Sequence, residues 1–240
     1  SLRPMRIAID ARELAGQPTG VGRYLSGILR EWTRMPDAAE HELVFCAPEA
    51  VDLTAWSGLR AAHEAGPGSG TIWEQRVLPR LAERAGAGVL FCPGYSGPMT
   101  GRTPLVVAIH DVSFAAHPEW FRWREGLRRR FVTRAAARRA ARVLTISEFS
   151  RREIVEHLGV PPSKVTVIYP GVGLDSPDCG PRIADRGPRT ADRAAKDPLL
   201  LYVGSIFNRR HVPETIKAFT RLARPVPDAR PGFRGGNRTV

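Results

Sequence analysis

The stretch that decides the fold is Leu105-Val106-Val107-Ala108-Ile109-His110-Asp111-Val112-Ser113-Phe114. Its first five residues are apolar, and a strand is apolar at successive positions only when both of its faces are buried. We therefore expect a central strand of a parallel sheet. His110 and Asp111 follow its carboxyl end, which is where open α/β sheets bind ligands. Alternatively, His110 packs or caps a turn, and Asp111 caps the next element.

Apolar runs of this kind recur along the chain and alternate with helical periodicity. Further strands are predicted over 5–10, 43–47, 89–92, 143–146 and 164–169, with residues 48–70 irregular. Helices are predicted over 21–32, over 71–85 with a kink or restart at Pro79, over 120–142, and from the N-cap Ser147 to Leu158. The alternation predicts an α/β fold with a doubly wound, Rossmann-like parallel sheet.

The chain divides by composition into three parts. Residues 5–172 form the predicted first domain, and the polar residues 173–197 are expected to be a linker or mobile loop. Residues 198–240 open with a predicted strand over 198–204, which is apolar at successive positions, and a predicted helix over 213–222. No strand is expected after this helix. A lone strand and helix cannot bury their apolar faces. We therefore expect an incomplete, truncated start of a second Rossmann-like domain.

Composition limits the class of partner. The net charge is +12, but only three of the 36 basic residues are lysine, a skew typical of GC-rich coding. Charge is therefore weak support for nucleic-acid binding, which we do not expect, whereas a nucleotide diphosphate or an acidic membrane surface fits. The three cysteines, Cys46, Cys92 and Cys179, show no C-x-x-C spacing, so neither a disulfide nor zinc is expected. No signal peptide or membrane-spanning run is evident, and a cytoplasmic location is expected.

A glycine loop joins the first strand to the first helix. Gly20 and Gly22 would let a ligand approach the backbone at the helix N-terminus, or they serve only a tight turn. A dinucleotide fingerprint would need glycine where Leu25 stands, and an acid after residues 43–47. Both are missing, so the sequence argues against an NAD site.

The helix over 120–142 is rich in arginine, with Phe121, Leu127, Phe131 and Ala135 on its predicted apolar side. Such a helix either lies on an anionic membrane or covers the sheet with a solvated outer face.

With these elements in order, the chain resembles the group 1 retaining glycosyltransferases, whose two Rossmann-like domains face each other in the GT-B arrangement. The motifs that carry the resemblance are Gly20–Tyr24, Ile109–Phe114 with His117–Phe121, Thr145–Arg151, Ile168–Val172, and Tyr202–Ser205 with Asn208–His211.

The resemblance implies transfer of a sugar from a nucleotide-diphosphate donor to an acceptor hydroxyl, with retention and without a metal or other cofactor. It implies a mannosyltransferase or glucosyltransferase whose acceptor is a glycan, a lipid-linked sugar or a small molecule. The basic charge and the arginine-rich helix leave open the alternative of peripheral contact with the inner membrane face.

The resemblance also assigns residues. His110 is the expected catalytic residue, beside the transferred sugar, and Gly20 and Gly22 form the glycine loop. Arg209 and Arg210, with Gly204, are expected to bind the diphosphate. Further candidate sugar or acceptor contacts are Asp111, Tyr95 and Ser147.

The family has two glutamates separated by seven residues late in its second domain. Residues 198–240 of this sequence contain no such pair. Glu148 and Glu156 have this spacing but are read as solvated helix acids. We therefore expect this chain to be catalytically incomplete, or a non-catalytic binding module of the same fold.

Overall fold

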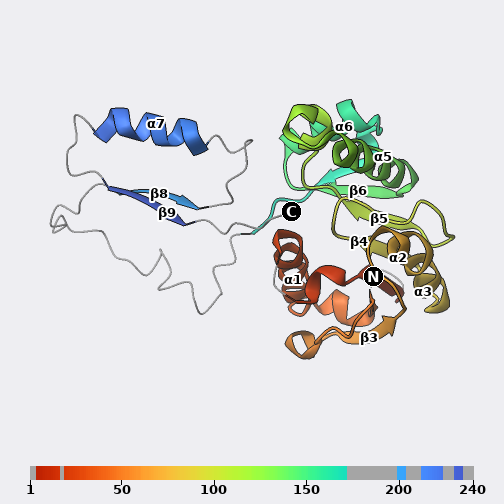
Figure 1. The fold of residues 1–240 in the computed structure, drawn as a ribbon. Helices are drawn as coiled ribbons and strands as arrows, with labels where there is room; N and C mark the ends of the chain where they lie inside the picture. The colour runs from red at the N-terminus through yellow and green to blue at the C-terminus, as the bar shows by residue number, and fades with distance from the viewer. Residues whose placement is uncertain (1–3, 17–18, 172–198, 204–211, 224–229, 235–240) are drawn as a thin grey trace, which may run out of the picture. The chain divides into compact units, whose positions relative to one another are not determined.

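The computed structural model describes residues 4–16, 19–171, 199–203, 212–223 and 230–234. The chain forms two compact units, residues 1–173 and 174–240, and each is described by itself. Figure 1 shows the strands of the first unit in one sheet with helices on both sides.

The first unit is built on a seven-stranded parallel sheet in the order β3-β2-β1-β4-β5-β6-β7. The strands are β1 (Arg6–Asp10), β2 (Glu42–Ala47), β3 (Arg60–Ala65), β4 (Val89–Cys92), β5 (Leu105–Ala108), β6 (Arg142–Thr145) and β7 (Val165–Val167). The strand order reverses between β1 and β4, so the predicted doubly wound α/β fold is confirmed. The reversal also marks the point where such sheets bind ligands.

Six α-helices accompany this sheet in the described part of the unit. They are α1 (Gly20–Trp32), α2 (Gly70–Arg76), α3 (Leu78–Arg84), α4 (Ser113–Ala116), α5 (Trp123–Arg139) and α6 (Glu148–Leu158). One face of the sheet is covered by α2, α3, α5 and α6, whose side chains share a buried cluster with β5. The other face packs against Leu25 and Leu29 of α1. Burial on both faces explains why β5 is apolar at successive positions.

Local signals predicted several helix ends correctly. The predicted helix over 71–85 restarts at Val77, so that Pro79 lies in the first turn of α3. The Ser147 hydroxyl accepts a hydrogen bond from Ser150 N and caps α6. Gly159 ends the same helix with a left-handed φ of 65°, a conformation that costs glycine little.

The strand β3 was not predicted, because residues 48–70 were expected to be irregular. Its sequence, Arg-Ala-Ala-His-Glu-Ala, contains no β-branched or aromatic residue. The strand lies at the sheet edge and pairs with β2 alone. Backbone hydrogen bonds to β2 therefore define it, and these leave no mark on side-chain periodicity.

The two alternatives for α5 place its large apolar side chains differently. The buried residues of this helix are Gly126, Thr133, Ala136 and Ala137. Leu127 and Phe131, which would face the sheet if the helix only covered it, are 60% and 66% exposed. Small side chains let the helix approach the sheet closely, and the large apolar ones are left on the outer face.

The second unit contains β8 (Leu199–Val203), α7 (Val212–Ala223) and β9 (Arg230–Arg234). The predicted strand and helix are confirmed, but the expectation of no further strand was wrong, since β9 pairs in parallel with β8. Both strands are edges of a two-stranded sheet in the described residues. An edge position tolerates Pro231, because the missing N–H can face away from the partner strand.

Cys46 in β2 and Cys92 in β4 are buried free thiols. Burial raises the pKa of Cys46 to about 12, so this side chain packs as a small neutral hydrophobe, as predicted. Cys179 lies outside the described residues.

Candidate functional site

His110 lies where predicted, just past the carboxyl end of β5. The preceding residue, Ile109, is fully buried and donates its N–H to Leu144 O at 2.8 Å, so the backbone reaches the edge as an extension of the strand. The His110 ring lies between two tyrosine rings, edge to face, with centroids 4.6 Å from Tyr24 and 5.4 Å from Tyr95. Helix α1 and the loops after β4 and β5 therefore meet around one imidazole.

Hydrogen bonding determines the tautomer of His110. Its Nε2 lies 2.9 Å from Pro93 O, and a carbonyl oxygen only accepts, so Nε2 carries the proton and Nδ1 is left as an acceptor. Burial lowers the pKa of His110 below its ordinary 6.5, and the Pro93 carbonyl and the Asp111 carboxylate offset part of this effect. The ring is therefore neutral at pH 7 and can accept a hydrogen bond from a hydroxyl.

Tyr95 holds the loop after β4 in place. It has a φ of 61°, the one positive value among the described non-glycine residues, and Ser96 N donates to Gly94 O across it at 2.6 Å. Two bonds stabilise this unfavourable turn: Tyr95 N donates to Ala108 O at 2.8 Å, and the phenol donates to Asp111 Oδ2 at 2.9 Å. A strained backbone held by several bonds is common where a side chain must be placed accurately.

Asp111 has a structural role as well as its place beside His110. Its Oδ1 accepts from Ser113 N at 3.0 Å and from Ser113 Oγ at 2.7 Å, at the start of α4. Asp111 thus closes a local turn onto the first residue of α4, whose N-cap residue is Val112. The same carboxylate binds the Tyr95 phenol through its other oxygen, so it links two loops of the candidate site.

The two glycines of the loop before α1 differ in their surroundings. A Cβ on Gly22 would collide with Glu13 O, whereas a Cβ on Gly20 would meet nothing within 4 Å among the described residues. Gly22 is therefore required by packing, and its N–H donates to the capping Thr19 Oγ1 at 2.9 Å. Gly20 leaves the N-terminus of α1 open to a ligand.

Ser147 uses its hydroxyl as a helix cap, and Ser150 is the residue of α6 that reaches the His110 segment. Ser150 Oγ donates to His110 O at 2.9 Å. Tyr24 and Ser150 were not predicted as site residues. Both lie inside motifs that carry the family resemblance, which is the one signal in the sequence that could have pointed to them.

A buried ion cluster lies at the same sheet edge and was also not predicted. Arg12 Nη2 donates to Asp10 Oδ2 at 2.6 Å and to Glu74 Oε2 at 2.7 Å, and these two acids are only 6% and 4% exposed. Burial lowers the pKa of Arg12, but the two carboxylates outweigh it and the pKa lies above its ordinary value. Ser96 Oγ donates to Glu74 at 2.8 Å, so the cluster joins the loops after β1 and β4.

Several expected residues remain untested by the structure. Gly204, Arg209 and Arg210 lie outside the described residues. Glu148 and Glu156 are exposed on α6, as expected of solvated acids. Ligand atoms of Glu153, Glu156 and His157 come within 4.8 Å of one another, a closeness that helical spacing alone produces.

Comparisons with known proteins identify the family and the fold of this chain. The family model of Glycosyltransferase Family 4 matches residues 18–176, and no curated protein matches the chain. The structure of Anabaena Alr3699/HepE in complex with UDP-glucose is 16% identical, with a TM-score of 0.50 over 98% of this chain and 70% of that one.

Two other solved structures are similar over nearly the whole chain. A glycosyltransferase from Rickettsia africae is 12% identical, with a TM-score of 0.44 over 98% of this chain and 69% of its own. The glycotransferase of kitacinnamycin is 12% identical, with a TM-score of 0.48 over 99% of this chain and 67% of its own. The Anabaena protein shares the fold of this chain, and the family model covers more than half of the sequence. The resemblance found in the sequence is confirmed, and the chain belongs to Glycosyltransferase Family 4.

Proposed function

We propose that this protein transfers a sugar from a nucleotide-diphosphate donor to an acceptor hydroxyl, with retention of the anomeric configuration and without a metal ion. The observation that carries the proposal is the neutral His110, held between Tyr24 and Tyr95 at the carboxyl edge of the sheet. A family domain with this edge, and a structural neighbour bound to UDP-glucose, support a nucleotide sugar as the donor.

Each residue then has a distinct task. Nδ1 of His110 accepts a hydrogen bond from a hydroxyl of the transferred sugar, and the bond from Nε2 to Pro93 O keeps the ring in this orientation. The open backbone at Gly20 lies near the diphosphate or acceptor. Arg209 and Arg210, with Gly204, are proposed to neutralise the diphosphate as its charge grows.

In the reaction, the bond from the anomeric carbon to the donor phosphate oxygen breaks, and a bond to the acceptor oxygen forms on the same face. The acceptor proton passes to the departing diphosphate or to solvent. Contacts that strengthen as the diphosphate becomes more negative lower the barrier, because they favour the transition state over the ground state.

The test is to incubate the gene product, expressed from its complete reading frame, with UDP-glucose or GDP-mannose, simple glycoside acceptors and EDTA. We expect release of the nucleoside diphosphate and a product whose anomeric configuration, read from its NMR coupling constants, matches the donor. Release only after a divalent metal is added would contradict the metal-free mechanism. Donor binding by calorimetry without any release would instead identify a binding module.

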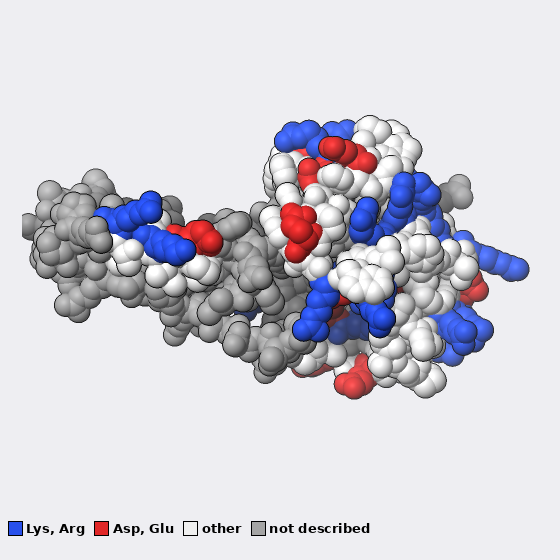
Figure 2. Space-filling view, turned by 45° about the horizontal axis from the view of Figure 1, so that its top comes forward, with Lys and Arg blue, Asp and Glu red and all other residues white. Residues whose placement is uncertain are grey.

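We also propose peripheral contact between α5 and an anionic membrane. Trp123, Leu127 and Phe131 lie four residues apart on one face of this helix and are 71%, 60% and 66% exposed. Exposed arginines flank them at positions 124, 128, 130 and 134, and Figure 2 shows basic side chains between uncharged ones on the first unit. No helix in the described ranges is long and apolar enough to cross a membrane.

Replacing Trp123, Leu127 and Phe131 together with serine is expected to abolish cosedimentation with vesicles that contain phosphatidylglycerol. Interfacial binding scales with buried apolar area and with attraction to anionic lipid, so neutral vesicles should bind the unmodified protein less. Phe149→Ser is the control, since Phe149 is equally exposed, at 64%, but lies on α6. Unchanged binding of the triple variant would contradict the proposal.

A further inference from the structure

A cavity of about 180 Å³ adjoins the candidate site, between the segment that follows β5 and the first turns of α6. Its lining includes the rings of His117, Trp120 and Phe149 and the polar side chains of Asp111, Ser150 and Glu153. Asp111 follows His110 in the chain, and Ser150 Oγ donates to the His110 carbonyl at 2.9 Å. The roles proposed above leave this cavity unused.

The cavity has exposed aromatic side chains at its wall. The His117 and Trp120 rings are stacked with their centroids 4.0 Å apart and their planes 15° from parallel. Trp120 is 37% exposed and Phe149 is 64% exposed. Large rings left open at a concave surface, with a few polar groups beside them, are typical of a small-molecule site.

The charge of the lining determines which ligand fits. Asp111 and Glu153 are carboxylates, and no lysine or arginine lines the cavity in the part of the chain that the structure describes. A phosphate or a carboxylic acid would be repelled there. A neutral ligand rich in hydroxyl groups is favoured instead, because ionised carboxylates accept hydrogen bonds from hydroxyls.

Aromatic walls and carboxylates together match a sugar ring. A pyranose has hydroxyls around its rim and C–H groups on its faces, and the partly positive C–H groups are attracted to the electron-rich face of an aromatic ring. The volume of about 180 Å³ is below the roughly 300–1,000 Å³ of pockets for drug-sized ligands. One ring therefore fits better than an extended ligand.

We infer that this cavity binds one pyranose ring of a saccharide acceptor, with its C–H groups against both Trp120 and Phe149 and its hydroxyls donating to Glu153. The identification of this sugar as the acceptor rests on the proposed function. Binding of the sugar itself requires neither a donor nor turnover.

The test uses the full chain labelled with 5-fluorotryptophan and titrated with methyl α- and β-glycosides of glucose, mannose and galactose. We expect a saturable shift of the Trp120 fluorine resonance, assigned with Trp120→Phe, for at least one glycoside. Trp123 lies on α5 outside the cavity, so its resonance should not move. EDTA in every sample excludes a metal held by Glu153 and His157.

Matched variants separate binding in the cavity from general surface effects. Phe149→Ala is expected to raise the dissociation constant of that glycoside at least tenfold. Phe131→Ala, at a residue of similar exposure on α5, should leave it unchanged. Glu153→Gln should weaken binding, and Glu156→Gln on the same helix should not. Melting curves check that each variant is folded. We expect Phe149→Ala to fold normally, because Phe149 is exposed and adds little to core packing.

Absence of a Trp120 shift with every glycoside would overturn the inference. A shift with hexanoate alone would also overturn it and would point to an acyl group. Failure of sugar transfer does not affect the titration, so the two proposals fail separately. Conversely, an active enzyme whose acceptor KM is unchanged in Phe149→Ala would overturn the inference and leave the proposed function standing.

Discussion

Replacement of His110 by alanine is expected to reduce kcat/KM for sugar transfer by about 100-fold or more, which is about 2.7 kcal/mol of transition-state stabilisation. The ring is half-buried, its Nε2 is bonded to Pro93 O, and within the described residues its Nδ1 has no hydrogen-bond partner. Its removal deletes a hydrogen-bond acceptor and little core packing. The melting temperature should therefore hardly change.

His63 provides a matched control, because its Nε2 also lies close to a backbone carbonyl, Glu49 O at 3.1 Å, but on the edge strand β3. His63→Ala should leave both turnover and melting temperature as they are. If His110→Ala melted several degrees lower and turned over normally, the alternative that His110 serves packing would be correct.

The pH dependence gives a second measurement on His110. Since its folded pKa lies below 6.5, the neutral acceptor form is the major form at pH 7 and is lost as the pH falls through the folded pKa. Activity should fall over that acidic range, and His110→Ala should lack this fall. The free energy of unfolding follows the same pattern. The contribution of neutral His110 is fully present above pH 6.5 and is lost as the pH falls through the folded pKa.

Replacement of Arg12 by methionine is expected to lower the free energy of unfolding by about 3–5 kcal/mol, because it leaves two buried carboxylates without their partner. Asp10 and Glu74 are almost fully buried, so water cannot take the place of the guanidinium. For a unit of this size the loss corresponds to a melting temperature lower by about 6–20 °C. Calorimetry or circular dichroism measures it.

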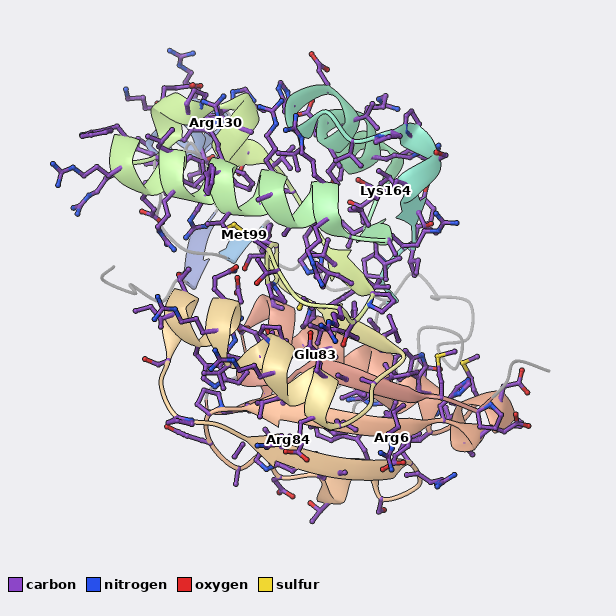
Figure 3. The ribbon with its side chains drawn as sticks, turned by 90° about the vertical axis from the view of Figure 1, so that its right-hand side faces the viewer. Arg6, Glu83, Arg84, Met99, Arg130 and Lys164 are labelled. Atoms are coloured by element: carbon purple, nitrogen blue, oxygen red, sulfur yellow. The ribbon has the colours of Figure 1, made fainter. Side chains whose placement is uncertain are left out.

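Surface ion pairs supply the control for this variant. Arg6 and Arg84, both labelled in Figure 3, pair with Glu42 and Glu64 through side chains that are 51% and 64% exposed. Their replacement by methionine should cost only about 0–1 kcal/mol each. Adding Asp10→Asn and Glu74→Gln to the Arg12 variant should recover part of the loss. Equal losses for Arg12 and Arg6 would show that burial of the cluster has no energetic consequence.

The parallel sheet, and the edge of it that holds the candidate site, could be predicted from the sequence. Buried strands such as β5 need apolar residues at successive positions, and this pattern is readable without any partner. Helix ends were readable for the same reason, because Ser147 and Gly159 act on the backbone within a few residues. The placement of His110, Asp111 and Gly20 at one edge followed from the parallel order of the strands.

Features that depend on contacts between distant segments became visible in the folded chain alone. The edge strand β3 is defined by its hydrogen bonds to β2. The outer face of α5 is defined by the small residues on its other side, which let the helix approach the sheet closely. The pair of tyrosines around His110 and the ion cluster of Arg12 each join residues separated by dozens of positions. Such contacts carry no local periodicity, so neither could be predicted from the spacing of residues in the chain.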